Sequence, residues 1–152
     1  MIKSVSLFIV ITFFTMGMST TYADGPDYND KASPLAPFLE LINEEQYEQA
    51  IVELDKALRD DPENADMLNL MAYSHRKLGH FEIALKYYQQ ALGIEPEHRG
   101  ANEYLGELYL QMGQLEKAEE RLQVLDDECF FGCDEYDELE EAIADYRKQN
   151  PS

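Results

Sequence analysis

The sequence predicts an all-α protein built from stacked helical hairpins, and three observations support this prediction. Ala50, Ala84 and Ala118 lie 34 residues apart (84 − 50 and 118 − 84). Apolar residues recur around each alanine at the three-to-four spacing of one helix face. Gly79 and Gly113 fall between the expected helices, where glycine suits the left-handed residue that ends a helix. A fixed period of about 20–50 residues indicates a repeat array in which neighbouring units bury each other's apolar faces.

The period divides the chain into three hairpins, which differ in clarity. We expect a repeat region of 34–128, with repeats at residues 31–64, 65–98 and 99–128. The middle repeat has the full pattern and is closed by Pro96. In the first repeat, Pro34 and Pro37 fall where the first helix should begin. Because proline is tolerated in the first turn of a helix but not inside it, we expect a short helix that starts near Pro37.

The C-terminal segment, residues 129–149, is expected to form a cysteine-containing turn followed by a capping helix. Leu139, Ile143 and Tyr146 recur there at helical spacing. Asp134 is the expected N-cap, since its carboxylate can accept hydrogen bonds from the first free amides. The apolar stripe of this helix predicts that it closes the open end of the third hairpin.

The N-terminal segment has the features of an export signal. Residues 1–23 are predicted to be a signal peptide cleaved after Ala23, because Lys3 precedes an apolar run of about fourteen residues. This run is shorter than the roughly 20 residues of a membrane span, so an uncleaved anchor is the weaker alternative. Residues 24–33 are rich in Asp, Gly and Pro and predict a flexible lead-in. We therefore expect a periplasmic or secreted protein without membrane insertion after signal cleavage.

The charge of the chain limits its possible partners. Its 31 acidic and 12 basic residues give a formal net charge of −19. A nucleic-acid surface requires clustered Lys and Arg, which are scattered here, so nucleic acid is not an expected partner. An anionic membrane surface is disfavoured for the same reason. The charge either attracts a basic partner or serves only solubility, and the sequence leaves both interpretations open.

The period, the small residues and the closing prolines Pro62 and Pro96 resemble the tetratricopeptide repeat family. The resemblance covers residues 31 to 128 and, with the predicted signal, implies a small exported bacterial member of the family. It implies three helical hairpins in a right-handed superhelix, closed here by the capping helix. It also implies that the concave face, lined by the first helix of each pair, binds a protein or peptide.

The binding groove that this resemblance implies can be assigned residue by residue. Its expected members are Leu39, Ile42, Asn43, Asp66, Asn69, Tyr73, Arg76, Lys77, Glu103, Glu107, Leu110 and Gln111. Arg76 and Lys77 are its only cations, too few for a clamp on a terminal carboxylate. We therefore expect a basic or extended peptide. Tyr73 is its central aromatic anchor, unless it is ordinary helix surface.

Cys129 and Cys133 are the only cysteines, and three interpretations compete for them. In an oxidising compartment, two cysteines close in sequence most simply form a disulfide. Two thiolates one helical turn apart also suit a soft metal such as copper. Thiol–disulfide exchange is the third possibility, although the acidic neighbours would raise the pKa of a thiol.

No motif predicts catalysis. The sequence has no phosphate-binding glycine loop, paired-histidine metal motif or nucleophile elbow. His75 is expected to be packed, whereas His80 and His98 are expected to be solvated. We therefore expect a non-catalytic binding adaptor or scaffold of the cell envelope, with no cofactor and no metal. The alternative is a periplasmic thiol–disulfide or copper-handling protein that acts through Cys129 and Cys133.

Overall fold

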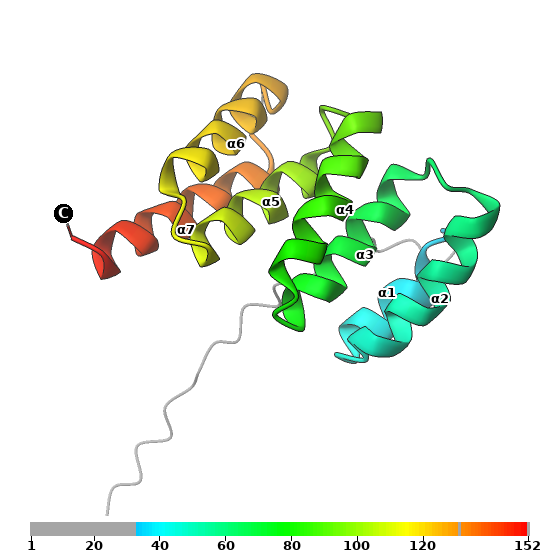
Figure 1. The fold of residues 1–152 in the computed structure, drawn as a ribbon. Coiled ribbons are helices and arrows are strands. Elements are labelled where there is room, and N and C mark those ends of the chain that lie inside the picture. The colour runs from blue at the N-terminus through cyan, green and yellow to red at the C-terminus, as the bar shows by residue number, and fades with distance from the viewer. Residues whose placement is uncertain (1–32, 131, 152) are drawn as a thin grey trace, which may run out of the picture.

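The computed structural model describes residues 33–130 and 132–151. In this part of the chain it contains only helices and turns, which confirms the prediction of an all-α repeat fold (Figure 1). The helices are α1 (Ala36–Asn43), α2 (Tyr47–Asp60), α3 (Ala65–Lys77), α4 (Phe81–Ile94), α5 (Arg99–Gln111), α6 (Leu115–Glu128) and α7 (Asp134–Gln149). The predicted signal peptide, and the lead-in except Ser33, lie outside the described residues.

The helices form three hairpins that stack side by side, from α1–α2 through α3–α4 to α5–α6 (Figure 1). Helix α7 follows the third hairpin and packs on both α5 and α6. The larger hydrophobic core extends from α1 to α5, and a smaller one joins α5, α6 and α7. Each hairpin therefore buries its apolar stripe against its neighbours, as expected of a repeat array.

The small residues of the period are buried between helices. Ala50, Ala84 and Ala118 are each completely buried. Gly106 allows a close approach of α5 and α7, because a Cβ atom at this position would lie 2.6 Å from both δ carbons of Leu139. A larger residue at position 106 would collide with α7, so this glycine permits α7 to pack on α5.

The three hairpin turns have the same backbone geometry. Glu45, Gly79 and Gly113 occupy equivalent positions and have φ angles of 58°, 76° and 74°. At each turn this residue donates its N–H to the carbonyl three residues earlier, and the next residue donates to the carbonyl five residues earlier. This is the Schellman arrangement, which requires a left-handed residue. The first repeat satisfies it with a glutamate instead of the preferred glycine.

Helices α3 and α5 begin with equivalent side-chain caps. Oδ1 of Asn64 accepts a hydrogen bond from Met67 N at 3.0 Å. Nδ1 of His98 accepts from Ala101 N at 3.2 Å, and His98 Nε2 lies 3.1 Å from Asp66 Oδ1. The side chain of His98 is only 6% exposed. The expectation that His98 is solvated was therefore wrong, because this ring caps α5 and links it to α3.

Helix α7 begins one residue earlier than predicted. Asp134 is its first helical residue, and the N-cap position belongs to Cys133, which makes no side-chain cap hydrogen bond. The prediction of Asp134 as N-cap was wrong. The physical reason is that Cys133 has an extended backbone and a sulfur bonded to Cys129, so the helix starts directly after the disulfide. Asp134 instead places a negative charge in the first turn, where the helix dipole favours it.

Candidate functional site

Side chains from α3 and α5 form an aromatic and cationic cluster on the first helices of the second and third hairpins. We call it the inner cluster, and it consists of Asn69, Tyr73, Arg76, Tyr104 and Glu107. The guanidinium of Arg76 lies 5.2 Å from the ring centre of Tyr73 and 5.4 Å from that of Tyr104. The two rings meet edge to face, 5.0 Å apart. The helical spacing of Asn69, Tyr73 and Arg76 places them on one face of α3.

The positively charged side chain of Arg76 is almost completely buried. It is 2% exposed, and its Nη1 lies 2.5 Å from Oε2 of Glu107 on α5. A guanidinium can pair with a carboxylate while its flat faces contact aromatic rings. A desolvated ion pair of this kind contributes little net stability, but removing one partner leaves the other charge buried and unpaired, which is destabilising. The pair therefore fixes how α3 and α5 lie against each other.

Asn69 has unsatisfied hydrogen-bonding capacity. Its side chain is buried, at 1% exposure for the residue, and neither Oδ1 nor Nδ2 has a hydrogen-bond partner. A Cβ atom at Gly100 would lie 3.3 Å from this Nδ2, so the amide sits against the start of α5. Because an unsatisfied buried amide costs stability, such a group in a folded protein points to strain or to a function.

Glu103 lies on α5 beside the cap helix and has an unusual protonation. Burial, a hydrogen bond with Glu138 and the nearby carboxylate of Glu107 raise the pKa of Glu103 to about 10. The residue is 2% exposed. At neutral pH the carboxyl group of Glu103 is therefore protonated and uncharged. The acidic faces of α5 and α7 can then pack together without repulsion between Glu103 and Glu138.

The predicted groove residues have different surroundings in the structure. Asn69, Tyr73, Arg76 and Glu107 come together in the inner cluster. Leu39 and Ile42 pack in the larger hydrophobic core, and Leu110 packs in the smaller one. The exposed members are Asn43, Lys77 and Gln111, and Asp66 is half-buried. Glu103 faces the cap helix. The use of these residues in binding stays a prediction.

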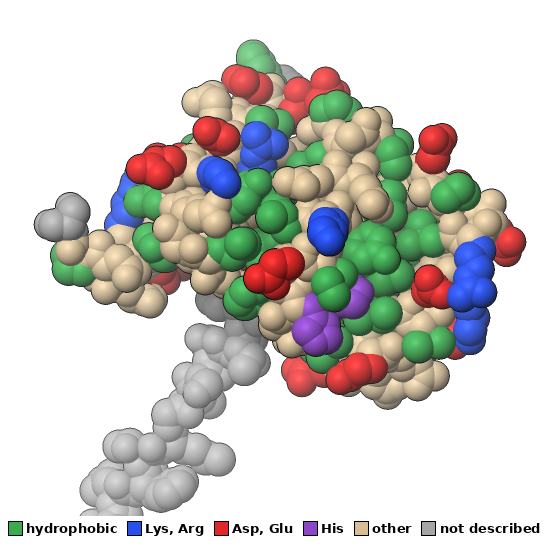
Figure 2. All heavy atoms as spheres, in the orientation of Figure 1, with side chains coloured by type: hydrophobic (Ala, Val, Ile, Leu, Met, Phe, Trp, Pro, Cys, Tyr) green, Lys and Arg blue, Asp and Glu red, His purple; other side chains and the backbone are tan. Residues whose placement is uncertain are grey.

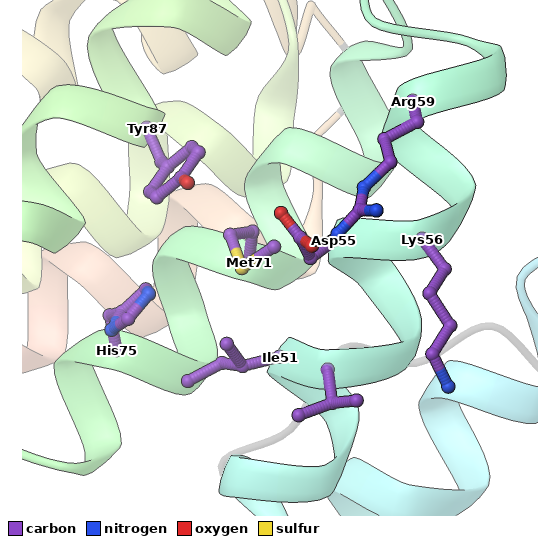
Figure 3. Close-up of a pocket in the computed structure, with 8 residues that line it drawn as sticks. Ile51, Asp55, Lys56, Arg59, Met71, His75 and Tyr87 are labelled. Carbon is purple, nitrogen blue, oxygen red and sulfur yellow. Dashed lines mark hydrogen bonds and ion pairs between the residues drawn. The ribbon is translucent and has the colours of Figure 1, made fainter.

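A second candidate surface lies on the outer side of the stack and was missed by the sequence analysis. We call it the outer hollow, a depression of about 280 Å³ between α2 and α4 with its floor on α3 (Figure 3). Figure 2 shows hydrophobic side chains gathered on this face, next to histidines and a column of basic side chains over α2. Its lining residues are Ile51, Val52, Asp55, Lys56, Arg59, Met71, His75 and Tyr87.

The wall of the outer hollow includes an ordered histidine. The ring of His75 stacks on Tyr87 at 5.7 Å with an interplanar angle of 5°, so the expectation that His75 is packed was correct. Nδ1 of His75 lies 3.3 Å from Nδ1 of His80. Burial and the proximity of His80 lower the pKa of His75. The ring is therefore neutral at pH 7 and adds an apolar face to the wall.

Cys129 and Cys133 form a disulfide with a Cα–Cα distance of 5.6 Å, which confirms the first of the three interpretations. Neither sulfur is a free thiolate in this state. Within residues 33–130 and 132–151, no group of three or more His, Cys, Asp or Glu side chains is arranged to hold a metal ion. Within the same ranges, no helix is both long and apolar enough to cross a membrane.

Comparison with known proteins agrees with this architecture. Residues 76–128 match the family profile described as tetratricopeptide repeat. Tetratricopeptide repeat protein 16 of Macaca fascicularis is 32% identical over 81 residues, which cover 53% of this chain and 9% of that protein. The protein of the same name from Homo sapiens is 32% identical over 77 residues, covering 51% and 9%. The chain thus spans about a tenth of the length of these relatives. The stacked hairpins agree with these matches, so the chain is similar to tetratricopeptide repeat proteins, with the family profile matched over residues 76–128.

Proposed function

We propose that the chain is a non-catalytic adaptor that binds a protein or peptide through the inner cluster and the groove predicted around it. The observation that carries the proposal is the amide of Asn69, which is buried without a hydrogen-bond partner beside an aromatic and cationic array. A peptide group offers one donor and one acceptor, and these match the free acceptor and donor of this amide.

The neighbouring side chains favour an extended segment as partner. Tyr73 and Tyr104 are large anchors that can contact a partner's side chains on either side of a bound peptide group, as binding hot spots often do. The net charge of −19 favours a basic segment. Because Asn69 and Tyr73 are each 1% exposed, binding requires a local rearrangement that uncovers them.

We further propose that the adaptor acts in the periplasm or outside the cell. This rests on the predicted signal peptide and agrees with the disulfide between Cys129 and Cys133, a bond typical of exported proteins. Chain recovered from the exported fraction of its own cells should begin at Asp24 when its N-terminus is sequenced. A chain found only in the cytoplasm with Met1 intact would contradict the proposed location.

The binding proposal is tested with Asn69→Leu. Leucine has a similar shape and leaves no unsatisfied amide, so we expect the folded state to keep or gain stability. Tagged wild-type and variant chains are used to capture partners from the protein's own cells, and the captured proteins are compared by mass spectrometry. We expect Asn69→Leu to lose a partner that the exposed control Glu120→Ala retains. A destabilised Asn69→Leu variant that retains every partner would overturn the proposal.

A further inference from the structure

We propose that the outer hollow binds an amphipathic helix of a partner protein whose apolar anchor is flanked by Asp or Glu. The hollow exists because α2 and α4 both pack on α3, while no Cα atom of α2 comes within 8 Å of one in α4. Ile51 and Val52 of α2, Met71 of α3 and Tyr87 of α4 give it an apolar lining (Figure 3). This inference concerns a different surface from the inner cluster and does not depend on the proposed function.

The repeat period provides an internal comparison for this surface. Val52 is 52% exposed. The equivalent residues of the next two repeats are Lys86 and Glu120, which are also exposed but charged. A single exposed apolar residue needs no explanation, but an apolar residue on the rim of a hollow indicates an interaction site. Helix α2 thus departs from the repeat pattern at position 52, which would contact a partner in the hollow.

The charges on the rim decide which partner fits. Lys56 and Arg59 line the hollow and have exposed side chains, in a chain with a net charge of −19. Each pairs with a carboxylate of its own helix, Lys56 with Glu53 at 2.8 Å and Arg59 with Asp55 at 2.5 Å. Exposed pairs of this kind contribute little, so a partner carboxylate can replace the internal one at small cost. The lining carries two cations against the single carboxylate of Asp55, so the rim suits an acidic partner.

The shape of the hollow favours a helix. It is a trough between two helices rather than a sheet edge, so an extended strand would find no backbone partners along it. An amphipathic helix can place apolar side chains at positions i and i+4 in such a trough and turn its polar side to the rim. Carboxylates beside the apolar stripe would then face Lys56 and Arg59.

The test uses two synthetic peptides that differ only in charge. Both have Leu at every third or fourth position; one has Glu and Ala elsewhere, and the other has Lys in place of Glu. Affinity is measured by fluorescence anisotropy, and the site is mapped from amide chemical-shift changes of the ¹⁵N-labelled chain. We expect the Glu peptide to bind one-to-one, with shifts confined to α2, α3 and α4. Non-specific attraction to a chain of net charge −19 would favour the Lys peptide instead.

Matched variants locate the effect. Val52→Glu copies the residue of the third repeat and should weaken binding of the Glu peptide about tenfold, as should the charge reversal Lys56→Glu with Arg59→Glu. Glu120→Lys, at the equivalent position of α6, should leave the affinity unchanged. Circular dichroism checks that each variant keeps its helices. Tighter binding of the Lys peptide at the hollow, or an affinity unaffected by Val52→Glu, would overturn the proposal.

Discussion

The two ends of the hairpin stack depart from the repeat period in different ways. At the C-terminal end, α7 packs closely on α5, with Gly106 against Leu139 and Glu103 hydrogen-bonded to Glu138. At the N-terminal end, α1 has only eight residues, and its turn closes with Glu45 in a left-handed conformation. The departure at the C-terminal end creates specific contacts that stabilise the fold. The departure at the N-terminal end leaves Glu45 in an unfavourable left-handed backbone conformation. Substitutions at the two ends should therefore change stability in opposite directions.

The largest effect is expected where the cap meets α5. Leu139→Ala should lower the free energy of unfolding by about 2–5 kcal/mol, because it empties a completely buried site. Gly106→Ala should cost about 1–3 kcal/mol alone, because its Cβ would overlap Leu139. In the Leu139→Ala background that cost should vanish. Urea unfolding of the two single variants and the double variant measures this coupling.

Gly93 provides the control for this cycle. It lies in α4, and a Cβ added there would meet no atom within 4 Å. Gly93→Ala should therefore stabilise the chain by about 0.5–1 kcal/mol through helix propensity alone. If Gly106→Ala behaved in the same way as Gly93→Ala, the close packing of the cap on α5 would be disproved.

The same interface predicts a pH dependence. The pKa of Glu103 is raised from 4.5 to about 10 by burial, by Glu138 and by the carboxylates of Glu107 and Glu135. The folded state therefore binds more protons than the unfolded state between these pH values, and stability falls as pH rises through this range. Glu103→Gln removes this loss and should stabilise the chain by about 3 kcal/mol at pH 7, with little change below pH 4.

Unfolding curves of wild type and Glu103→Gln at several pH values test this expectation. The quantity to follow is the difference between the two chains, since other carboxylates titrate in both. Glu141→Gln, an exposed position on α7, serves as control and should shift stability by no more than about 0.5 kcal/mol. A difference that stays constant from pH 4 to pH 8 would show that Glu103 is ionised in the folded state.

The repeat period was sufficient to predict the hairpins, because it records contacts between neighbouring units. It predicted Ala50, Ala84 and Ala118 as close-approach positions, and all three are completely buried. It also contains a signal that was not used. Asn64 and His98 are 34 residues apart (98 − 64), and both cap the first helix of a pair. Comparing these two positions would have identified His98 as a cap instead of a solvated residue.

Features that depend on non-repeated contacts were not predictable in this way. The burial and protonation of Glu103 depend on α7, which no repeat pattern places against α5. The start of α7 depends on the disulfide, so Asp134 could not be recognised as the first helical residue from its capping preference alone. The outer hollow depends on the gap between α2 and α4, although the apolar residue Val52 at a position otherwise charged was visible in the sequence.

A smaller effect is expected from the disulfide. Replacing Cys129 and Cys133 by Ser should lower stability by about 2 kcal/mol, since the closed loop is short. The packing of Leu139 on Gly106 remains, so α7 should stay docked. Hydrogen exchange should accelerate at the first turn of α7 but not in α5. Equal acceleration in both helices would mean that the disulfide, rather than the packing, holds the cap in place.

The smallest effect tests the N-terminal end. Glu45 has a φ of 58°, whereas the two equivalent turns use Gly79 and Gly113. A left-handed conformation costs a residue with a side chain about 1 kcal/mol, and glycine at position 45 would avoid this cost. Glu45 is exposed, so removing its side chain should lose few contacts. Part of this gain is offset because glycine is more flexible in the unfolded chain. We therefore expect Glu45→Gly to raise the free energy of unfolding by up to about 1 kcal/mol.

The opposite substitution, Gly79→Ala, tests whether the stability gained by Glu45→Gly comes from the backbone conformation. A Cβ at Gly79 would meet no atom within 4 Å, so only its φ of 76° opposes the change. We expect a loss of about 1 kcal/mol, measured by urea unfolding beside Glu45→Gly. If both substitutions lowered stability, the side chain of Glu45 would have to contribute a contact that outweighs its backbone strain. The first turn would then resemble the C-terminal cap, with its departure from the period compensated by a local interaction.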